Sequence, residues 1–97
     1  MELHIFARFH ARAGYEDAVA AALRAVVPPT RDEPGCCAID AYRSIRDLRL
    51  FHIHSCWIDE AAFDHHATLP HTVRFLACVQ PLIDHPLDIT RSLLLPG

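Results

Sequence analysis

The sequence predicts a small α+β domain in which four strands form one antiparallel sheet and helices cover one face of it. Two observations lead to this prediction. Three segments alternate between two faces with the period of two that marks strands, and a fourth strand is expected near the C-terminus. Between them, two segments repeat apolar residues at helical spacing. The 97 residues leave room for one such domain, so we expect a single domain over residues 1–97.

The first strand is predicted at residues 2–10, where every second side chain is apolar, namely Leu3, Ile5, Ala7 and Phe9. Glu16 and Asp17 then supply the negative charge that favours the first turn of a helix. That helix carries one apolar stripe, made of Ala18, Val19, Ala22, Leu23, Val26 and Val27. We expect Pro28 and Pro29 to end it, because proline lacks the N–H that a helix needs.

Two further strands follow, at Cys36–Arg43 and Arg49–Ile58. In the first of them, alternation predicts one face with Cys37, Ile39 and Ala41. In the second, one face carries Phe51, Ile53, Ser55 and Trp57, and the opposite face carries Leu50, His52, His54 and Cys56. The face that ends in Trp57 is the more apolar of the two, so we expect it to look toward the helices.

The second helical region is predicted to be broken. Asp59 is a suitable N-cap for a helix through Phe63, and Pro70 suits the first turn of a new one. The spacing predicts an inward stripe of Val73, Leu76, Ala77, Gln80 and Ile83, and a last strand at Leu87–Leu95. The order strand–helix–strand–strand–helix–strand is the ferredoxin-like arrangement.

Composition excludes several classes of function. The net charge is −3 and the basic residues are spread along the chain, which argues against a nucleic-acid partner. The chain has no lysine, and this excludes Schiff-base chemistry and a P-loop lysine. The first residues do not resemble a secretory signal, and no apolar run is long enough to span a membrane. We therefore expect a cytoplasmic protein that is not bound to a membrane.

The candidate site combines Trp57 at the end of a strand with His66 and His71 around the helix break. His66 follows Phe63 by three residues and is predicted to face inward, whereas His65 is predicted to face solvent. Histidine titrates near neutral pH, so an accessible imidazole can act as a general base or acid. Each residue also has a plain structural explanation, since Trp57 and His66 can be core residues and His71 can be a helix-capping or surface residue.

The sequence does not decide the role of two other clusters of side chains, one of histidines and one of cysteines. His52 and His54 share one strand face, with His4 and His10 on a neighbouring strand, and His-x-His can form half of a metal site. The four cysteines are Cys36, Cys37, Cys56 and Cys78, without a C-x-x-C pair, and any of them could approach an imidazole to form a nucleophilic pair. Buried structural thiols and hydrogen-bonded imidazoles are the commoner explanation of both clusters.

The chain resembles the antibiotic-biosynthesis-monooxygenase domain family from about Leu3 to Ile83. Three stretches carry the resemblance: Glu33-Pro34-Gly35-Cys36, then Phe51 through Trp57-Ile58-Asp59-Glu60-Ala61-Ala62-Phe63, then His66-x-Thr68-x-Pro70-His71. It implies a homodimer, a dimeric α+β barrel in which the two sheets meet and each subunit keeps a pocket between sheet and helices. Some family members oxidise aromatic compounds with molecular oxygen without a cofactor, whereas others degrade haem or isomerise a phosphorylated sugar.

Departures from the family pattern make some of these activities less compatible with the sequence than others. Ser55 stands where the family commonly has an acidic residue, which weakens the isomerase hypothesis. The chain contains no asparagine, a residue that the polyketide oxygenases and haem degraders use. The region of the haem-ligating histidine holds Phe75, Leu76 and Ala77, so haem degradation is not expected.

We therefore predict a cofactor-independent monooxygenase that acts on a small aromatic, phenol- or quinol-like compound, without a metal. His66 and His71 are the predicted catalytic residues, and the predicted substrate-binding residues are Trp57, Ser55, Phe51, Ile53 and Phe63. The expected partners are this substrate and a second copy of the chain. Two alternatives stay open, a dimer that binds a small ligand without changing it, and an isomerase of a small carbonyl or phosphosugar compound.

Overall fold

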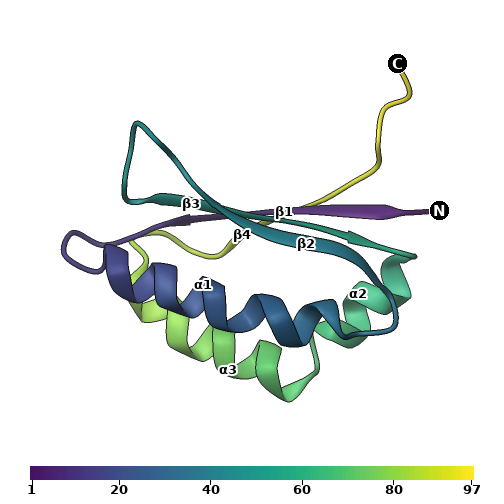
Figure 1. Ribbon diagram of the computed structural model, residues 1–97, viewed down its shortest axis with the longest axis horizontal. Coiled ribbons are helices and arrows are strands. Elements are labelled where there is room, and N and C mark those ends of the chain that lie inside the picture. Colours follow the sequence, from purple (N-terminus) through teal and green to yellow (C-terminus); the bar gives the residue numbers. More distant parts are fainter.

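A computed structural model describes all 97 residues and shows one four-stranded sheet with every helix on the same face (Figure 1). The elements in chain order are β1 (Leu3–His10), α1 (Glu16–Arg31), β2 (Cys36–Arg43), β3 (Leu50–Trp57), α2 (Glu60–His66), α3 (Pro70–Val79), the 3₁₀ turn η1 (Gln80–Leu82) and β4 (Asp88–Ser92). The sheet order is β2-β3-β1-β4 with every pair antiparallel. The predicted ferredoxin-like α+β fold and its broken second helix are therefore confirmed.

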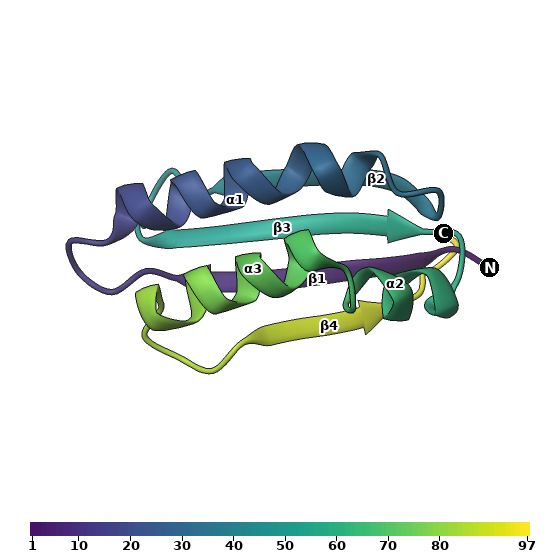
Figure 2. The same ribbon diagram turned by 90° about the horizontal axis from the view of Figure 1, so that it is seen from below.

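The core lies between the sheet and the helices. The inward residues of β1 and β3 are buried as the alternation predicts, and they pack against Val19, Leu23 and Val26 of α1. Figure 2 shows α1 lying along the β2–β3 half of the sheet, whereas α2 and α3 lie over the β1–β4 half. No helix in the structure has the length and apolar character needed to cross a membrane.

The predicted end of the first helix was wrong, because α1 continues through Pro28 and Pro29 to Arg31. The two prolines fall in the last turns, and the carbonyls that lose an N–H partner belong to the exposed residues Arg24 and Ala25, where water can reach them. Thr30 is fully buried, and its hydroxyl donates to the carbonyl of Val26 at 2.6 Å. Packing of this last turn against the core therefore outweighs the local effect of proline.

The predicted faces of the second strand were wrong at its start. A β-bulge lies between Cys36 and Ala38, so that Cys36 pairs with Trp57 and Ala38 with Cys56. The extra residue shifts the alternation by one position. Cys36 consequently packs toward Trp57 on the helix side, whereas Cys37 lies with Cys56 on the opposite face. Ile39 and Ala41 keep the face that the sequence predicts, opposite Ser55 and Ile53.

Two further predictions need correction. In α3 the inward stripe begins at Thr72 and includes Val79, whereas Val73, Ala77 and Gln80 face solvent. The last strand ends at Ser92 instead of Leu95, and Leu93–Leu95 extend away from the sheet with exposed side chains (Figure 1). Hydrophobicity alone leads to both errors. In α3 the buried residue is Thr72 and not its apolar neighbour Val73, and at the C-terminus the apolar residues Leu93–Leu95 are exposed although apolar residues are typical of a strand.

The face of the sheet without helices carries a row of imidazoles and the exposed aromatic side chains of Phe6 and Tyr42. Phe6 is 51% exposed and its ring lies 4.9 Å from that of His54. The ring of His54 also lies nearly parallel to that of His4, and the two rings share a hydrogen bond of 3.0 Å between His4 Nδ1 and His54 Nε2. The predicted proximity of His4 to the His52/His54 strand face is therefore confirmed. His10 is at the other end of β1, where it binds Asp84 and Asp47.

Candidate functional site

Three side chains from separate segments converge between the sheet and the helix break. One oxygen of Glu33, Oε2, lies 2.7 Å from Nδ1 of His66 and 2.8 Å from Nε2 of His71. The Glu33 side chain is only 7% exposed, and those of His66 and His71 are 12% and 20% exposed. A nearly buried carboxylate thus accepts hydrogen bonds from both predicted catalytic histidines. The two rings, whose centroids are 6.1 Å apart, are held by this one group.

The chain positions these groups through two short motifs. Glu33, Pro34 and Gly35 form the turn between α1 and β2, and the Gly35 carbonyl accepts from the backbone N–H of Ile58 at 3.0 Å. A Cβ at position 35 would collide with the side chain of Ala62, so glycine lets the turn pack directly against α2. Asp59 caps α2 by accepting from the N–H of Ala62 at 2.8 Å. The turn that carries Glu33 and the helix that carries His66 are therefore fixed to each other.

The break between α2 and α3 lets two histidines five residues apart face the same carboxylate. His66 is the last residue of α2, and His71 is the second residue of α3 after Pro70. The hydroxyl oxygen of Thr72 lies 3.2 Å from Nδ1 of His66, beside the carboxylate. With both oxygens near Nδ1, the proton of a neutral His66 ring belongs on that nitrogen, and Nε2 keeps its lone pair.

His66 packs against two aromatic side chains that form one wall of the site. Trp57 is 1% exposed, and its ring centroid lies 4.7 Å from that of His66. Phe63 contacts both rings, at centroid distances of 5.7 Å. The indole N–H of Trp57 donates to the hydroxyl of Ser55 at 2.9 Å, so this buried donor is satisfied. Trp57 and Ser55 thereby fix the position of the imidazole from the side of the sheet.

A small apolar cavity of about 90 Å³ lies beside His66, between the sheet and helices α2 and α3. Its lining includes four of the predicted site residues, Ile53, Ser55, Phe63 and His66. Ile89 of β4 also lines it and is 40% exposed, so the cavity meets solvent on the β4 side. The structure does not bring Phe51 to this cavity, because Phe51 lies near the start of β3 with the Arg43 guanidinium 5.0 Å above its ring. Trp57 and His71 lie around the cavity but do not line it.

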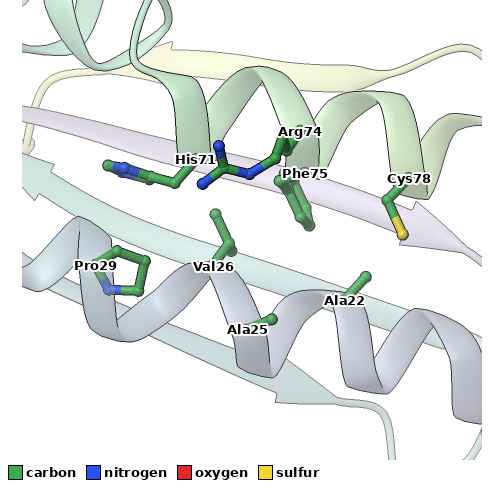
Figure 3. A pocket seen from close by; sticks show the side chains of 8 residues that line it. All are labelled: Ala22, Ala25, Val26, Pro29, His71, Arg74, Phe75 and Cys78. Carbon is green, nitrogen blue, oxygen red and sulfur yellow. The ribbon is translucent and has the colours of Figure 1, made fainter.

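A second and larger hollow of about 360 Å³ lies between α1 and α3 (Figure 3). Its apolar lining comes from both helices, and Figure 3 shows Val26 and Phe75 facing each other across it. His71 and Arg74 border this groove from α3. His71 therefore belongs to two environments, since its ring lines the groove while its Nε2 contacts Glu33 beside the smaller cavity.

The same three side chains are a candidate donor set for a metal. One donor atom each from Glu33, His66 and His71 lies within 4.8 Å of the other two, and two histidines with one carboxylate is a combination that binds Fe²⁺ or Zn²⁺ in proteins. The hydrogen bonds from both rings to Glu33 account for this proximity without an ion. Neither His52 nor His10 belongs to a group of donors close enough to share a metal.

Two of the four thiols, those of Cys36 and Cys56, have raised pKa values. Burial, followed by the charge of Glu33, raises the pKa of the Cys36 thiol. Burial also raises the pKa of Cys56 to about 11, and the neighbouring Cys37 and Glu2 add to the shift. A raised pKa keeps a thiol protonated at neutral pH, whereas a nucleophilic cysteine needs a lowered one. These two cysteines therefore do not support the hypothesis of a cysteine–histidine nucleophile.

Glu33 is the residue of the candidate site that the sequence analysis does not predict. The sequence places it 33 residues before His66 and in a turn next to proline and glycine, where an acidic residue is usually exposed. The feature of the sequence that could have identified Glu33 as a site residue is its place in the Glu33-Pro34-Gly35 stretch, which carries part of the family resemblance. Only the packing of this turn against α2 brings the carboxylate to the two imidazoles.

Comparison with known proteins assigns the family. The family model described as antibiotic biosynthesis monooxygenase matches residues 3–77, so this chain belongs to that family. It is 35% identical over 88 residues to "Putative monooxygenase Rv0793" of Mycobacterium tuberculosis, covering 89% of this chain and 84% of that protein.

Solved structures agree with this assignment. The structure of Rv0793 matches with a TM-score of 0.93 and 29% identity, covering 100% of this chain and 98% of that one. PA3566 of Pseudomonas aeruginosa matches with a TM-score of 0.91 and 30% identity, covering 98% and 95% of the two chains. SO0527 of Shewanella oneidensis matches with a TM-score of 0.85 and 26% identity over 94% and 90%. The ferredoxin-like fold of this chain is thus the fold of its family.

Proposed function

We propose that this protein is a cofactor-independent monooxygenase that oxidises a small phenol with molecular oxygen, using His66 as the base. Membership of the monooxygenase family supports the reaction class. The observation that carries the proposal is the arrangement of His66, whose Nδ1 faces Glu33 at 2.7 Å while its ring borders an apolar cavity. A carboxylate that orients an imidazole in this way is the arrangement by which many enzymes prepare a histidine as a general base.

The reaction needs no external reductant, because the substrate supplies the electrons. A phenol with a free para C–H reacts with one O₂ to give a para-quinone and one water. The substrate loses two hydrogens and gains one oxygen atom, and the second oxygen atom leaves as water. The protein then has to remove the phenolic proton, hold the anion in a dry site and position it for oxygen.

In this proposal Nε2 of His66 accepts the phenolic proton. Glu33 and Thr72 hold Nδ1, which fixes the ring and stabilises the positive charge that develops on it. His71 shares Glu33 and acts as a positioning residue, not as the base. Trp57 and Phe63 keep the imidazole in place and form an apolar wall against which an aromatic ring can pack.

The cavity sets the size of the substrate. A cavity of roughly 150 Å³ accommodates benzene, and the cavity beside His66 measures about 90 Å³. A single aromatic ring therefore fits only with a modest displacement of the lining, for which the half-exposed Ile89 at the mouth is the best placed. We accordingly propose a one-ring phenol in preference to a polycyclic substrate.

Oxygen uptake with a panel of one-ring phenols tests the proposal, using metal-free protein. We expect wild-type turnover, and a fall of about 10²–10⁴-fold when His66→Ala removes the base. His65→Ala is the matched control, because this neighbouring histidine is exposed and faces away from the site. Full activity in His66→Ala, or equal loss in both variants, would contradict the assigned role.

A second candidate function is the reversible binding of a small ligand without chemistry. The observation that favours it is the groove between α1 and α3, which at about 360 Å³ is larger than the cavity beside His66. Ligand pockets typically measure roughly 300–1,000 Å³. Saturable binding of a ligand that consumes no oxygen and is lost in Arg74→Ala would favour this candidate over the enzyme.

We also propose that two copies pair through the faces of their sheets that carry no helices. This proposal follows the family resemblance, and the exposed Phe6 and Tyr42 on that face support it. A charge there has to be desolvated on pairing, so His52→Glu should shift the sedimentation of the protein toward monomer. Val73→Glu places the same charge on the exposed side of α3 and serves as the control. A His52→Glu protein that sediments like wild type would exclude this interface.

A further inference from the structure

A second cluster of metal-binding side chains lies outside the candidate site, on the sheet face without helices. One donor atom each from Glu2, Cys37 and Cys56 lies within 4.8 Å of the other two. Nε2 of His4 lies 4.0 Å from the sulfur of Cys56. Two sulfurs and one carboxylate oxygen therefore gather at the end of the sheet where β1 begins and β3 ends, with an imidazole nitrogen next to one of the sulfurs.

The backbone creates this cluster in a specific way. His4 and Cys56 are directly opposite each other in the β1–β3 pairing. Cys37 reaches the same face only because of the bulge between Cys36 and Ala38, since regular alternation would turn it toward the helices. Bulges are a common means of redirecting one side chain at a functional position. Here the redirected side chain is a thiol, and it is directed at a second thiol.

The surroundings of His4 match those of a metal ligand. One nitrogen of the ring, Nε2, faces the sulfur of Cys56, and the other, Nδ1, is hydrogen-bonded to Nε2 of His54 at 3.0 Å. Metal-binding histidines almost always use their second nitrogen in such a bond, which fixes the tautomer and the orientation of the ring. The planes of the two rings differ by only 8°, so His54 fixes the orientation of the His4 ring as well as its tautomer.

From this arrangement we propose that Cys37, Cys56, His4 and Glu2 bind one Zn²⁺ per chain. Zinc takes four ligands of these types in a tetrahedron, with Zn–S bonds of about 2.3 Å, so two sulfurs bound to one ion lie roughly 3.8 Å apart. The donor atoms of Glu2, Cys37 and Cys56 lie within 4.8 Å of one another, so small rotations of these side chains bring them to this geometry. His4 joins them from beside Cys56, whose sulfur lies 4.0 Å from Nε2. None of the ion pairs in the protein involves Glu2, so its carboxylate is available to the cation.

Binding is an exchange of protons for metal and involves no redox step. Each thiol loses a proton as its sulfur bonds to Zn²⁺, and His4 binds through the lone pair on Nε2. Two protons are therefore released for each ion bound at the two cysteines. The site is independent of the proposed oxygenase chemistry, because it lies on the opposite face of the sheet from Glu33 and His66.

Cobalt(II) is a spectroscopic probe for this site, because a cobalt–thiolate bond produces an intense charge-transfer absorption in the near ultraviolet. We expect reduced, chelator-treated protein to take up one Co²⁺ per chain with this absorption and to lose it when Zn²⁺ is added. The donor set Glu33, His66 and His71 contains no sulfur, so metal bound there does not contribute to the signal.

Cys37→Ser tests the assignment, because Cys37 is exposed in the single chain, on the face that we propose to pair with a second copy, and its replacement leaves the core of the chain intact. Its affinity should fall by more than about 100-fold, since loss of an outer hydrogen-bond partner alone costs roughly 10–100-fold. His4→Gln provides a second variant with the same expected direction. Cys78→Ser removes an exposed thiol on α3 and should bind like wild type.

Three results would overturn the proposal. The first is wild-type protein without the thiolate absorption. The second is a Cys37→Ser protein whose affinity equals that of Cys78→Ser. The third is reduced protein that takes up no metal and instead joins Cys37 to Cys56 in a disulfide on exposure to air.

Discussion

Replacing Glu33 with glutamine removes the charge that holds His66 and His71 while keeping the size of the side chain. In the structure one oxygen of a carboxylate that is 7% exposed accepts two hydrogen bonds, at 2.7 and 2.8 Å. Hydrogen bonds to a charged group contribute about 1.5–3 kcal/mol each, against about 0.5–1.5 kcal/mol for neutral pairs. Weakening both bonds should therefore lower the free energy of unfolding by about 2–3 kcal/mol.

Urea denaturation at neutral pH and constant protein concentration measures this loss. For a chain of this length, 1 kcal/mol corresponds to roughly 4–5 °C in Tm, so Tm in a thermal scan should fall by about 8–15 °C. Glu60→Gln makes the same chemical change at the exposed ion pair with Arg91, where the expected loss is below about 1 kcal/mol. A loss within about 0.5 kcal/mol for Glu33→Gln, as at an ordinary surface position, would refute the account of a buried carboxylate that organises the site.

Three further predictions concern residues around the site and at the far end of the sheet. Ser55→Ala leaves the buried indole N–H of Trp57 without an acceptor and should cost about 1–3 kcal/mol in urea denaturation; an unchanged midpoint would mean that this bond does not matter. Gly35→Ala should destabilise the protein by about 1–3 kcal/mol through its collision with Ala62, and adding Ala62→Gly should recover part of the loss; a double variant less stable than Gly35→Ala would contradict this. The hydrogen bonds that the His10 ring donates to Asp84 and, second, to Asp47 raise the pKa of His10 above its ordinary value of 6.5. Its contribution to stability is therefore full below pH 6.5 and is lost as the pH rises through the raised pKa. An NMR titration should show this raised pKa and its return toward 6.5 in Asp84→Asn, and equal values in both proteins would be the contrary result.

Much of the fold was predictable because period-two and helical patterns dominate the inward residues. The buried residues of β1 and β3 are those that alternation indicates, and Asp59 and Pro70 mark the helix starts by their local chemistry. Prediction from local sequence failed where packing against the core outweighs the unfavourable effect of proline on a helix, as at Pro28 and Pro29. It also failed where one extra residue shifts a strand, as at Cys37.

The site was predictable only in part, for a physical reason. His66 and Trp57 belong to regular elements, so their inward direction follows from spacing. Glu33 lies in a turn, where side-chain direction has no period, and its partners come from segments more than 30 residues away. Phe51 was predicted to line the site because it shares a strand face with Trp57, but it lies at the other end of the strand. Alternation predicts the face on which a side chain lies, and it does not predict which end of the strand borders a cavity.

The central claim is that Glu33 holds His66 with its proton on Nδ1 and leaves Nε2 free to accept a proton. Long-range ¹⁵N–¹H NMR on protein labelled at histidine distinguishes the two nitrogens of this ring, with His66→Ala providing the assignment. We expect a neutral His66 protonated at Nδ1 in the wild-type protein, and a loss of this preference in Glu33→Gln. A wild-type His66 protonated at Nε2, or a tautomer unchanged by Glu33→Gln, would contradict it.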